Sequence, residues 1–254
     1  MATAVEQEVL SASFTRSLRD SCLVVIPALN EEATIVNVVQ NLRRQGFSRI
    51  RVIDKGSSDE TAERARAAGA EVLSEPRCGY GQACRRGLQN IPRGVAWILF
   101  CDADGSDNLD DVDLMIAAAE DGDLVLGNRF ATRTGREAMT PVQRLGNQLV
   151  SKLIEYGWGF RFADFGPLRL IRREALETIA MRDRGFGWNA VMQNRAIEAR
   201  FQHREGPVRS RPPRGGRRQI SGDERGAAPA GGGAVRAGAA GCAGRGGGRV
   251  SGGL

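Results

Sequence analysis

The chain has 254 residues, of which 41% are hydrophobic and 26% charged, enough for one substantial domain or for one domain with a tail. Its single histidine, His203, excludes a Ser-His-Asp triad and a multi-histidine metal site built within one chain. The five cysteines are scattered and never spaced C-x-x-C, which favours neither a disulfide scaffold nor a zinc site. No run reaches the roughly 18 apolar residues of a membrane span, and residues 1–16 do not resemble a secretory signal, so we expect a cytoplasmic protein.

The charge balance is basic. Lysine and arginine number 36 against 30 acidic residues, for a net charge of +6, and the excess is concentrated between Arg195 and Arg218. This segment predicts binding to an anion such as a phosphate, a nucleic acid or an acidic membrane surface. With a single histidine, the chemistry must depend on carboxylates and arginines, with or without a metal ion.

In chain order, the first 20 residues lack hydrophobic periodicity and predict a flexible lead-in. Short β-branched and apolar runs then predict strands at residues 22–26, 50–53, 70–73, 97–102, 123–127, 166–171 and 208–211. Segments with apolar residues at helical spacing predict helices at residues 30–44, 60–68, 79–88, 109–119, 141–156, 173–179 and 187–200. Asn30 is the predicted N-cap of the first helix.

The alternation of strands and helices predicts an α/β fold with a mostly parallel sheet covered by helices on both faces. From residue 223 onward the composition changes. Residues 226–254 contain 12 glycines and 8 alanines, with almost nothing large to bury. Such a segment cannot offset its ordering entropy, so we expect a disordered tail over residues 223–254, and a reading-frame shift near Asp223 would produce the same composition.

The fourth predicted strand, in the run from Trp97 to Gly105, ends on two carboxylates, Asp102 and Asp104. Ligands in open α/β sheets lie beyond the carboxyl ends of the strands, and paired acids there suggest Mg²⁺ or Mn²⁺ shared with a diphosphate. Asp-x-Asp-Gly is equally a turn signal, so the pair alone leaves both interpretations open.

Two other predicted strands end on polar segments, PALNE from Pro27 and DKGSSD from Asp54. In a parallel sheet these ends share one edge with Asp102 and Asp104, where all three could line one pocket. The alternative is that Asp54 and Asp59 only cap the turn and the helix that follows it.

Seven segments carry a resemblance to a known family. They are LVVIPALNEE, VIDKGSSDET, GYGQACRRGL, LFCDADG, DLVLGNR, FADFGPLRLIRREAL and GPVRSRPPRGGRRQISG. In order and spacing they resemble the family 2 glycosyltransferases of GT-A fold, in the dolichyl-phosphate mannose synthase-like branch, over residues 21–222. The resemblance implies a Rossmann-like GT-A domain there.

The resemblance also implies roles for individual residues. It implies a metal site at Asp102, Asp104 and Ser106, in which Asp104 is the direct ligand and acts in catalysis, and Ser106 stands where some relatives carry glutamine. A mobile basic loop that closes over the diphosphate or the acceptor phosphate would contain Arg209, Arg211, Arg214 and Arg217. The implied nucleotide-sugar contacts are Pro27, Leu29, Asn30, Glu31, Ile53, Asp54, Asp102, Ala103 and Arg129.

The chain also departs from the family pattern. Leu29 stands where a tyrosine is common, and Lys55 places a cation where an acid or amide is usual. Val191 stands where relatives carry a glutamate three residues after the tryptophan. These departures bear on base, sugar and acceptor preference.

The expected reaction is inverting transfer of a hexose from a nucleotide-diphosphate sugar of GDP-mannose or UDP-glucose type. A hydroxyl acceptor would need a general base, for which Asp164 is the candidate, although it could simply be an acid before a turn. A phosphate acceptor is already ionised near neutral pH, which together with Val191 favours polyprenyl phosphate and peripheral attachment to the cytoplasmic face of a membrane. The alternatives are a soluble hydroxyl acceptor or an inactive relative that binds RNA or a membrane surface; we expect no nucleic-acid partner.

Overall fold

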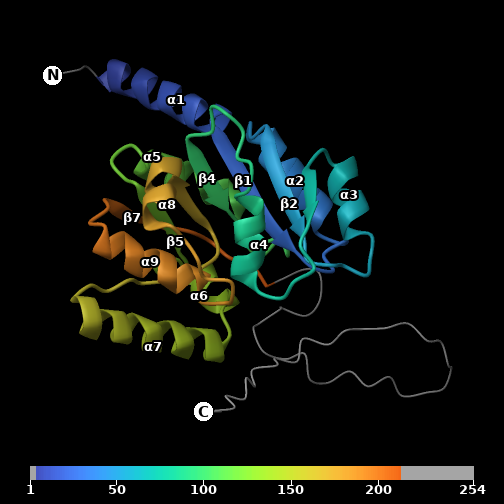
Figure 1. The fold of residues 1–254 in the computed structure, drawn as a ribbon. Helices are drawn as coiled ribbons and strands as arrows, with labels where there is room; N and C mark the ends of the chain where they lie inside the picture. The colour runs from blue at the N-terminus through green and yellow to red at the C-terminus, as the bar shows by residue number, and fades with distance from the viewer. Residues whose placement is uncertain (1–3, 213–254) are drawn as a thin grey trace, which may run out of the picture. The chain divides into compact units, whose positions relative to one another are not determined.

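A seven-stranded sheet is at the centre of the protein (Figure 1). The computed structural model describes the backbone of residues 4–212 and the side chains from residue 9 onward. The expected tail at 223–254 and two of the four predicted loop arginines, Arg214 and Arg217, lie outside the described residues. In spatial order the strands are β3 (Glu71–Ser74), β2 (Arg49–Asp54), β1 (Cys22–Ala28), β4 (Trp97–Phe100), β6 (Arg169–Arg172), β5 (Leu124–Asn128) and β7 (His203–Pro207).

The sheet is mostly parallel, as predicted. The pairs β1·β2, β2·β3, β1·β4 and β5·β7 are parallel, and only β6 runs antiparallel to its neighbours β4 and β5. The helices are α1 (Ala4–Asp20), α2 (Ile35–Arg44), α3 (Thr61–Ala67), α4 (Tyr80–Gly87), α5 (Val112–Ala118), α6 (Arg133–Ala138), α7 (Pro141–Trp158), α8 (Arg173–Ile179) and α9 (Trp188–Glu198). Short 3₁₀ turns precede α5 at Leu109–Asp111 and follow β5 at Arg129–Ala131.

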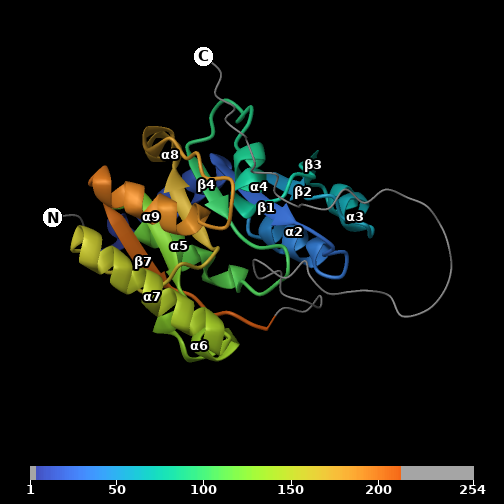
Figure 2. The ribbon, with the colours of Figure 1, turned by 60° about the horizontal axis from the view of Figure 1, so that its bottom comes forward.

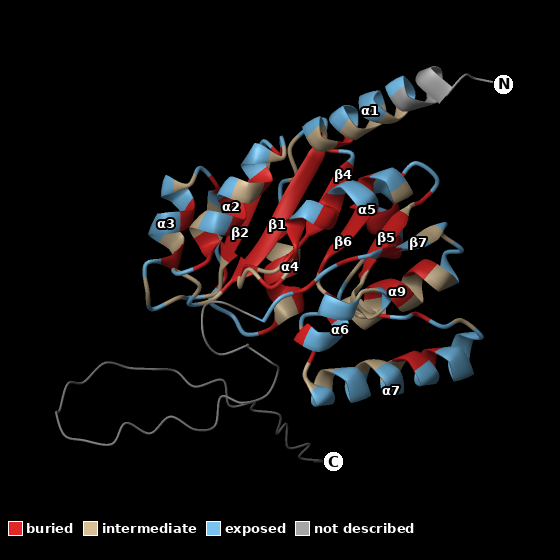
Figure 3. Cartoon of the chain, turned by 180° about the vertical axis from the view of Figure 1, so that it is seen from behind, coloured by how far each residue is buried: buried red, intermediate tan, exposed pale blue. Residues whose placement is uncertain are grey.

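Helices cover both faces of the sheet, and each face has its own hydrophobic core (Figures 2 and 3). Because side chains alternate along a strand, Val24 belongs to one core and Val25 to the other. The first core receives side chains from α1, α2 and α5, and the second receives them from α4, α8 and α9. A sheet buried on both faces explains the almost uninterrupted apolar character of β1 and β4.

Strand register brings the predicted polar segments to one edge. In the β1·β2 ladder Pro27 pairs with Ile53 and Ala28 with Asp54. On the other side of β1, Val25 pairs with Phe100, two residues before Asp102. The carboxyl ends of β1, β2 and β4 therefore converge as the sequence predicts.

Three local predictions are corrected, and one helix had not been predicted. The first 20 residues were expected to be a flexible lead-in, but Ala4–Asp20 form helix α1, which buries Leu18 in the first core. Asn30 is not a helix N-cap, because α2 begins at Ile35 after Thr34, and Asn30 itself has a φ of 55° in the loop. The last strand is β7 at His203–Pro207, not residues 208–211, which make one isolated bridge, Asp107 to Ser210. Helix α6 was not predicted; it is a single short helix that the Thr132 side chain caps.

We predict that α1 is an integral part of the folded domain. Leu18 is 2% exposed whereas Leu10, on the same helix, is 65% exposed. Leu18→Ala should lower the free energy of unfolding by about 2–4 kcal/mol, because a buried leucine leaves a cavity. The matched variant Leu10→Ala should change it by less than about 0.5 kcal/mol. Urea denaturation of both variants measures this, and equal effects would show that α1 does not pack as described.

Candidate functional site

The loop after β4 carries Asp102 and Asp104 and is shaped by its own carboxylates. The backbone N–H of Asp102 donates to Oδ2 of Asp107 at 3.0 Å, and the N–H of Ser106 donates to Oδ1 of Asp104 at 2.8 Å. Ala103 between the two acids is buried. The segment is thus a turn, as one of the two interpretations held, and the turn presents both carboxylates at the sheet edge.

Negative charge is crowded at this edge. Burial, together with the nearby carboxylates of Asp107 and Asp104, raises the pKa of Asp102 well above its usual value. Burial likewise raises the pKa of Asp107 to about 6, with Asp104 contributing. Burial, followed by the charges of Asp104 and Asp59, raises the pKa of Glu31 to about 7. The end of β1 and the end of β4 therefore lie within one electrostatic field.

A divalent cation fits this donor set. The described residues contain no cluster of three or more His, Cys, Asp or Glu side chains that could hold a metal alone. Mg²⁺ and Mn²⁺, however, are typically held by one or two carboxylates, and substrate phosphates and water complete the shell. Asp102 and Asp104 provide such oxygen ligands. The carboxylates of Asp107 and Asp104 add to burial in raising the pKa of Asp102, and a cation would offset their repulsion.

The loops after β1 and β2 are joined to each other. Asn30 receives a hydrogen bond from the N–H of Ser58 at 2.8 Å through its Oδ1, and its own N–H donates to Oγ of Ser57 at 3.0 Å. The N–H of Glu31 donates to Oγ1 of Thr61 at 2.7 Å. Pro27 and Ile53 are buried in the adjoining strands, and Leu29, directly after β1, is half-buried.

The two acids of the β2 loop act within the turn. Asp54 accepts hydrogen bonds from the N–H groups of Gly56 and Ser57. Asp59 accepts from the N–H of Thr61 at the start of α3. The capping interpretation therefore describes both residues, while Asp54 stays partly exposed at the edge.

Arg129 and Asp164 form a buried ion pair. Nε of Arg129 donates to Oδ2 of Asp164 at 2.7 Å, a second guanidinium nitrogen donates to Oδ1 at 2.7 Å, and the Arg129 N–H also donates to Oδ2 at 2.9 Å. The side chains are 14% and 1% exposed. Burial alone would lower the pKa of Arg129, but the hydrogen bonds and charge of Asp164, with the charges of Asp107 and Asp102, raise it.

Asp164 is also held by groups outside the pair. Its Oδ1 accepts from Nδ2 of Asn147 at 3.2 Å and from the N–H of Phe165 at 2.7 Å. With both oxygens engaged, Asp164 could accept a proton from a substrate only after the ion pair opens. This geometry argues against the general-base role considered from the sequence.

Side chains from α9 and β6 fix the backbone around Asp164. Nε2 of Gln193 donates to the Asp164 carbonyl at 2.9 Å, and Nδ2 of Asn189 donates to the Phe165 carbonyl at 3.2 Å. Arg169, 1% exposed, donates to the Gly166 carbonyl, and burial lowers its pKa to about 10. A Cβ on Gly166 would lie 3.2 Å from Nε of Arg129, so only a residue without a side chain fits easily against the ion pair.

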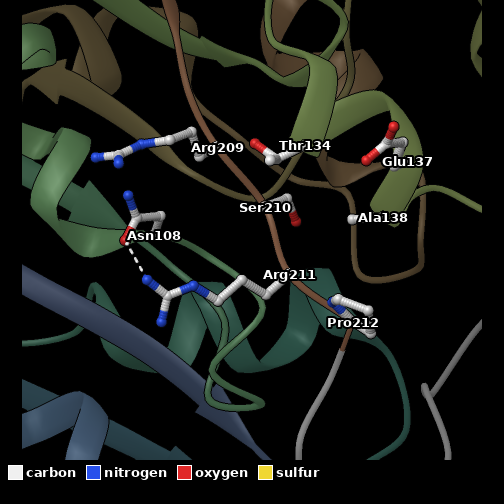
Figure 4. Close-up of a pocket in the computed structure, with 8 residues that line it drawn as sticks. All are labelled: Asn108, Thr134, Glu137, Ala138, Arg209, Ser210, Arg211 and Pro212. Carbon is white, nitrogen blue, oxygen red and sulfur yellow. Dashed lines mark hydrogen bonds between the residues drawn. The ribbon is translucent and has the colours of Figure 1, made fainter.

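The start of the predicted basic loop is tied to the turn that follows Asp104. Ser106 accepts at its carbonyl from the N–H of Arg211 at 2.8 Å and from Oγ of Ser210 at 3.1 Å. Nη2 of Arg211 donates to Oδ1 of Asn108 at 3.3 Å (Figure 4). Arg209 instead pairs with Asp111, its Nη2 lying 2.6 Å from Oδ1, so its charge is already neutralised by the protein.

This segment borders a cavity of about 410 Å³. One wall carries Arg209, Arg211 and Asn108, and α6 contributes Thr134, Glu137 and Ala138 from the other side (Figure 4). Nδ2 of Asn108 is buried and has no hydrogen-bond partner among the residues that the structure describes. The structure describes two of the four predicted loop arginines. Arg209 is paired with a carboxylate, whereas the described side-chain partner of Arg211 is the neutral Asn108.

The sequence interpretation did not single out Asp107 or Asp111. Asp107 is the third acid of the run Asp-Ala-Asp-Gly-Ser-Asp, and this spacing was the available signal. Asp111 pairs with Arg209 across 98 residues of sequence, and no local pattern reveals such a partner. The same holds for Asn147, which reaches Asp164 from α7.

The model of the Glycosyl transferase family 2 matches residues 23–180. The chain belongs to glycosyl transferase family 2. An uncharacterized glycosyltransferase of Mycobacterium tuberculosis is 34% identical over 209 residues, which cover 82% of this chain and 93% of that protein. Glycosyltransferase AglJ of Haloferax volcanii is 34% identical over 176 residues, or 68% of this chain, which spans only 57% of AglJ.

Two further family comparisons concern ligands and acceptors. The Dolichyl-phosphate hexose transferase of Haloferax volcanii is 30% identical over 164 residues, which cover 63% of this chain and 70% of that protein. Among solved structures, glucosyl-3-phosphoglycerate synthase from Mycobacterium tuberculosis, in complex with Mn²⁺, UDP and glucosyl-3-phosphoglycerate, matches with a TM-score of 0.61 at 25% identity. That match covers 80% of this chain and 76% of the other. The predicted family and the GT-A fold are thereby confirmed.

The acid cluster of this glycosyltransferase predicts a pH-dependent stability. The pKa of Glu31 rises from 4.5 to about 7 on folding, so the folded state retains a proton that the unfolded state releases, and stability falls as pH rises between these values. Full burial would make such a shift worth about 3 kcal/mol. Since the side chain is only half-buried, we expect about 1 kcal/mol.

Glu31→Gln should remove the part of the pH-dependent loss of folding stability that Glu31 causes. Its carboxamide can still accept from Oγ1 of Thr34, which donates to Oε2 of Glu31 at 3.0 Å. Urea denaturation at pH 5 and pH 8 should show a smaller stability difference for Glu31→Gln than for the unsubstituted protein. Glu137→Gln, which breaks an exposed pair with Arg133, is the control and should leave the difference unchanged. Identical pH dependence in all three proteins would contradict the clustering of charge around Glu31.

Proposed function

We propose that the protein is an inverting glycosyltransferase that transfers a hexose from a nucleotide-diphosphate sugar, of GDP-mannose or UDP-glucose type, to polyprenyl phosphate. The family and the fold support a nucleotide-sugar donor. A relative named Dolichyl-phosphate hexose transferase supports a lipid-phosphate acceptor. The reaction then takes place where a cytoplasmic enzyme meets the membrane surface.

The donor lies along the carboxyl ends of β1, β2 and β4 in this proposal. Pro27, Leu29 and Ile53 form its apolar side, and Asn30, Glu31 and Asp54 its polar side. Asp102 and Asp104 would hold Mg²⁺ or Mn²⁺, and such an ion would supply positive charge next to the departing diphosphate. Ser106 contributes to the metal surroundings mainly through the turn it builds with Asp104.

Arg129 is the cation that the protein itself supplies to the diphosphate or to the acceptor phosphate. Its guanidinium is held by Asp164, so it does not have to be ordered when substrate binds. Asp164 is therefore a positioning residue. Arg211, next to the turn after Asp104, adds a second cation at the mouth of the site.

The observation that carries the choice of acceptor is the engagement of Asp164. A hydroxyl acceptor needs a base to take its proton, but the candidate base has both oxygens bound to Arg129, Asn147 and backbone N–H groups. Phosphate, with a second pKa of about 6, is already a nucleophile at neutral pH. Attack of its oxygen on the anomeric carbon breaks the bond to the nucleoside diphosphate, and no proton has to be removed.

A soluble acceptor is the second candidate. The likeness to glucosyl-3-phosphoglycerate synthase favours it, because that protein's complex contains a sugar joined to phosphoglycerate. This acceptor also carries a phosphate that could bind Arg129 or Arg211. It would, however, require proton removal from a hydroxyl, which the geometry at Asp164 does not favour.

A donor and acceptor panel tests the proposal. The full-length protein is incubated with Mn²⁺, GDP- or UDP-sugars, and polyprenyl phosphate, 3-phosphoglycerate or no acceptor, while nucleoside diphosphate release is followed. We expect release that depends on polyprenyl phosphate, and a fall of at least about 100-fold in Asp104→Asn, because a catalytic metal contributes several kcal/mol. Asp121→Asn, in an exposed turn, is the matched control. Release that depends only on 3-phosphoglycerate would support the second candidate, and no release with any donor would exclude both.

A double-mutant cycle tests the role of Asp164. Asp164→Asn should lower kcat/KM by about 100-fold, since a displaced arginine clamp costs about that much. If Asp164 acts through Arg129, the variant Arg129→Gln/Asp164→Asn should be no slower than Arg129→Gln alone. The pH profile of Asp164→Asn should keep the acidic limb of the unsubstituted enzyme. Multiplicative losses together with a vanished acidic limb would instead identify Asp164 as a general base.

A further inference from the structure

Helix α7 has an apolar stripe on the side that faces away from the rest of the protein. Its members and their exposed fractions are Val142 (73%), Leu145 (68%), Leu149 (59%), Leu153 (60%) and Tyr156 (95%). Steps of three, four, four and three residues place all five within an arc of about 80° on the helix. Ser151 and Ile154 on the opposite side are buried against the body. Figure 3 shows α7 at the margin of the molecule, mostly exposed.

The stripe is concentrated rather than scattered. Of the ten large hydrophobic residues that are exposed in the described part of the chain, six lie on α7. Single exposed apolar side chains are normal, but a continuous patch marks an interaction surface. Gly146 and Gly157 border the stripe. A Cβ atom added at either glycine would have no described atom within 4 Å, so the surface beside the stripe is uncovered in the described part of the chain.

The orientation of this stripe is set by the helix itself. Thr140 and Gln143 form a capping box, Pro141 occupies the first turn, and Gly159 ends the helix with a φ of 68°. Oγ of Ser151 donates to the Phe162 carbonyl at 2.6 Å, which anchors the buried side. A helix with both ends capped and one face anchored presents its other face in a defined direction.

Basic side chains accompany the stripe. Lys152 lies at its rim, about 20–40° around the helix from Leu145 and Tyr156. Exposed Arg161 follows the end of α7, and exposed Arg136 belongs to α6 just before it, where Arg133 is paired with Glu137. Nη2 of Arg144 donates to the Arg136 carbonyl at 2.7 Å, which joins the two helices. This arrangement complements an apolar layer beneath an anionic surface.

We propose that α7 is a membrane-docking helix that lies in the interface of an anionic lipid bilayer, with this stripe facing the acyl chains. No helix in the described residues is long and apolar enough to cross a membrane. A stable dimer usually requires about 20–30 residues from each partner, many more than one stripe provides. A lipid surface therefore suits α7 better than a second copy of the chain.

The same helix reaches the candidate site. Asn147, on α7, donates to Asp164, which in turn holds Arg129. Docking through α7 would therefore place the Arg129 region close to the lipid phosphates. This functional consequence rests on the proposed polyprenyl-phosphate acceptor, whereas the docking surface itself does not.

Vesicle flotation with the full-length protein tests the surface. We expect binding to vesicles of equal phosphatidylcholine and phosphatidylglycerol, weaker binding to phosphatidylcholine alone, and a decrease with salt. Leu145→Gln/Leu149→Gln/Leu153→Gln should bind at least tenfold more weakly. Val9→Gln/Leu10→Gln/Leu114→Gln removes three exposed apolar side chains elsewhere, each 52–65% exposed, and should bind like the unsubstituted protein.

The outcomes separate this inference from the proposed function. Unchanged vesicle binding in the stripe variant would overturn the docking role of α7. A protein that ignores vesicles and is dimeric, but becomes monomeric in the stripe variant, would show that the stripe is a self-interface. If the protein binds vesicles, the stripe variant does not, and no sugar is transferred to polyprenyl phosphate, the docking surface is confirmed and the proposed acceptor is wrong. With a short-chain, water-soluble polyprenyl phosphate, the stripe variant should keep its activity.

Discussion

The crowding of carboxylates at the ends of β1 and β4 is the constraint on which the rest of the site depends. Glu31, Asp102, Asp104 and Asp107 lie in one field, and the pKa values of Glu31, Asp102 and Asp107 are raised. Such a cluster is unfavourable without a positive partner, because burial and mutual repulsion both oppose ionisation of the carboxyl groups. A divalent cation and the guanidinium of Arg129 would relieve that repulsion together, and this is how the proposed function reconciles an acidic sheet edge with a diphosphate ligand.

The antiparallel strand β6 makes this arrangement possible. An all-parallel sheet would place the loop before β6 at the opposite edge, away from Asp102. Because β6 runs against β4, the segment that precedes it returns to the edge where β4 and β5 end. Asp164 thus meets Arg129, which immediately follows β5, although the two residues are 35 positions apart. The antiparallel direction of β6 therefore places Asp164 where it can hold the buried guanidinium of Arg129.

Local patterns predicted the fold well and the partners poorly. The strands β1 and β4 were recognisable because a sheet buried on both faces demands unbroken apolar runs, and β2 was recognisable by its β-branched Ile50, Val52 and Ile53. The acids at the ends of these strands were therefore placed correctly. The pairings Arg129 with Asp164 and Arg209 with Asp111 depend on contacts between distant segments, which periodicity does not encode. Helix α1 was missed because, among its described hydrophobic side chains, only Leu18 is buried and Phe14 partly buried, which leaves little hydrophobic periodicity in the sequence.

The same limit explains the different fates of the predicted arginines. A basic segment seen in sequence looks like a uniform anion site, yet the structure distinguishes its members by their partners. Arg209 belongs to a neutral pair with Asp111, whereas Arg211 meets only the amide oxygen of Asn108 and the Ser106 carbonyl through its backbone. Arg209 would have to share its charge with Asp111, whereas Arg211, held by neutral groups, would meet a phosphate with its full charge. Arg211 is therefore the described residue of this segment that is best suited to meet a phosphate, and Arg209 is the anchor that keeps it beside the turn of Asp104.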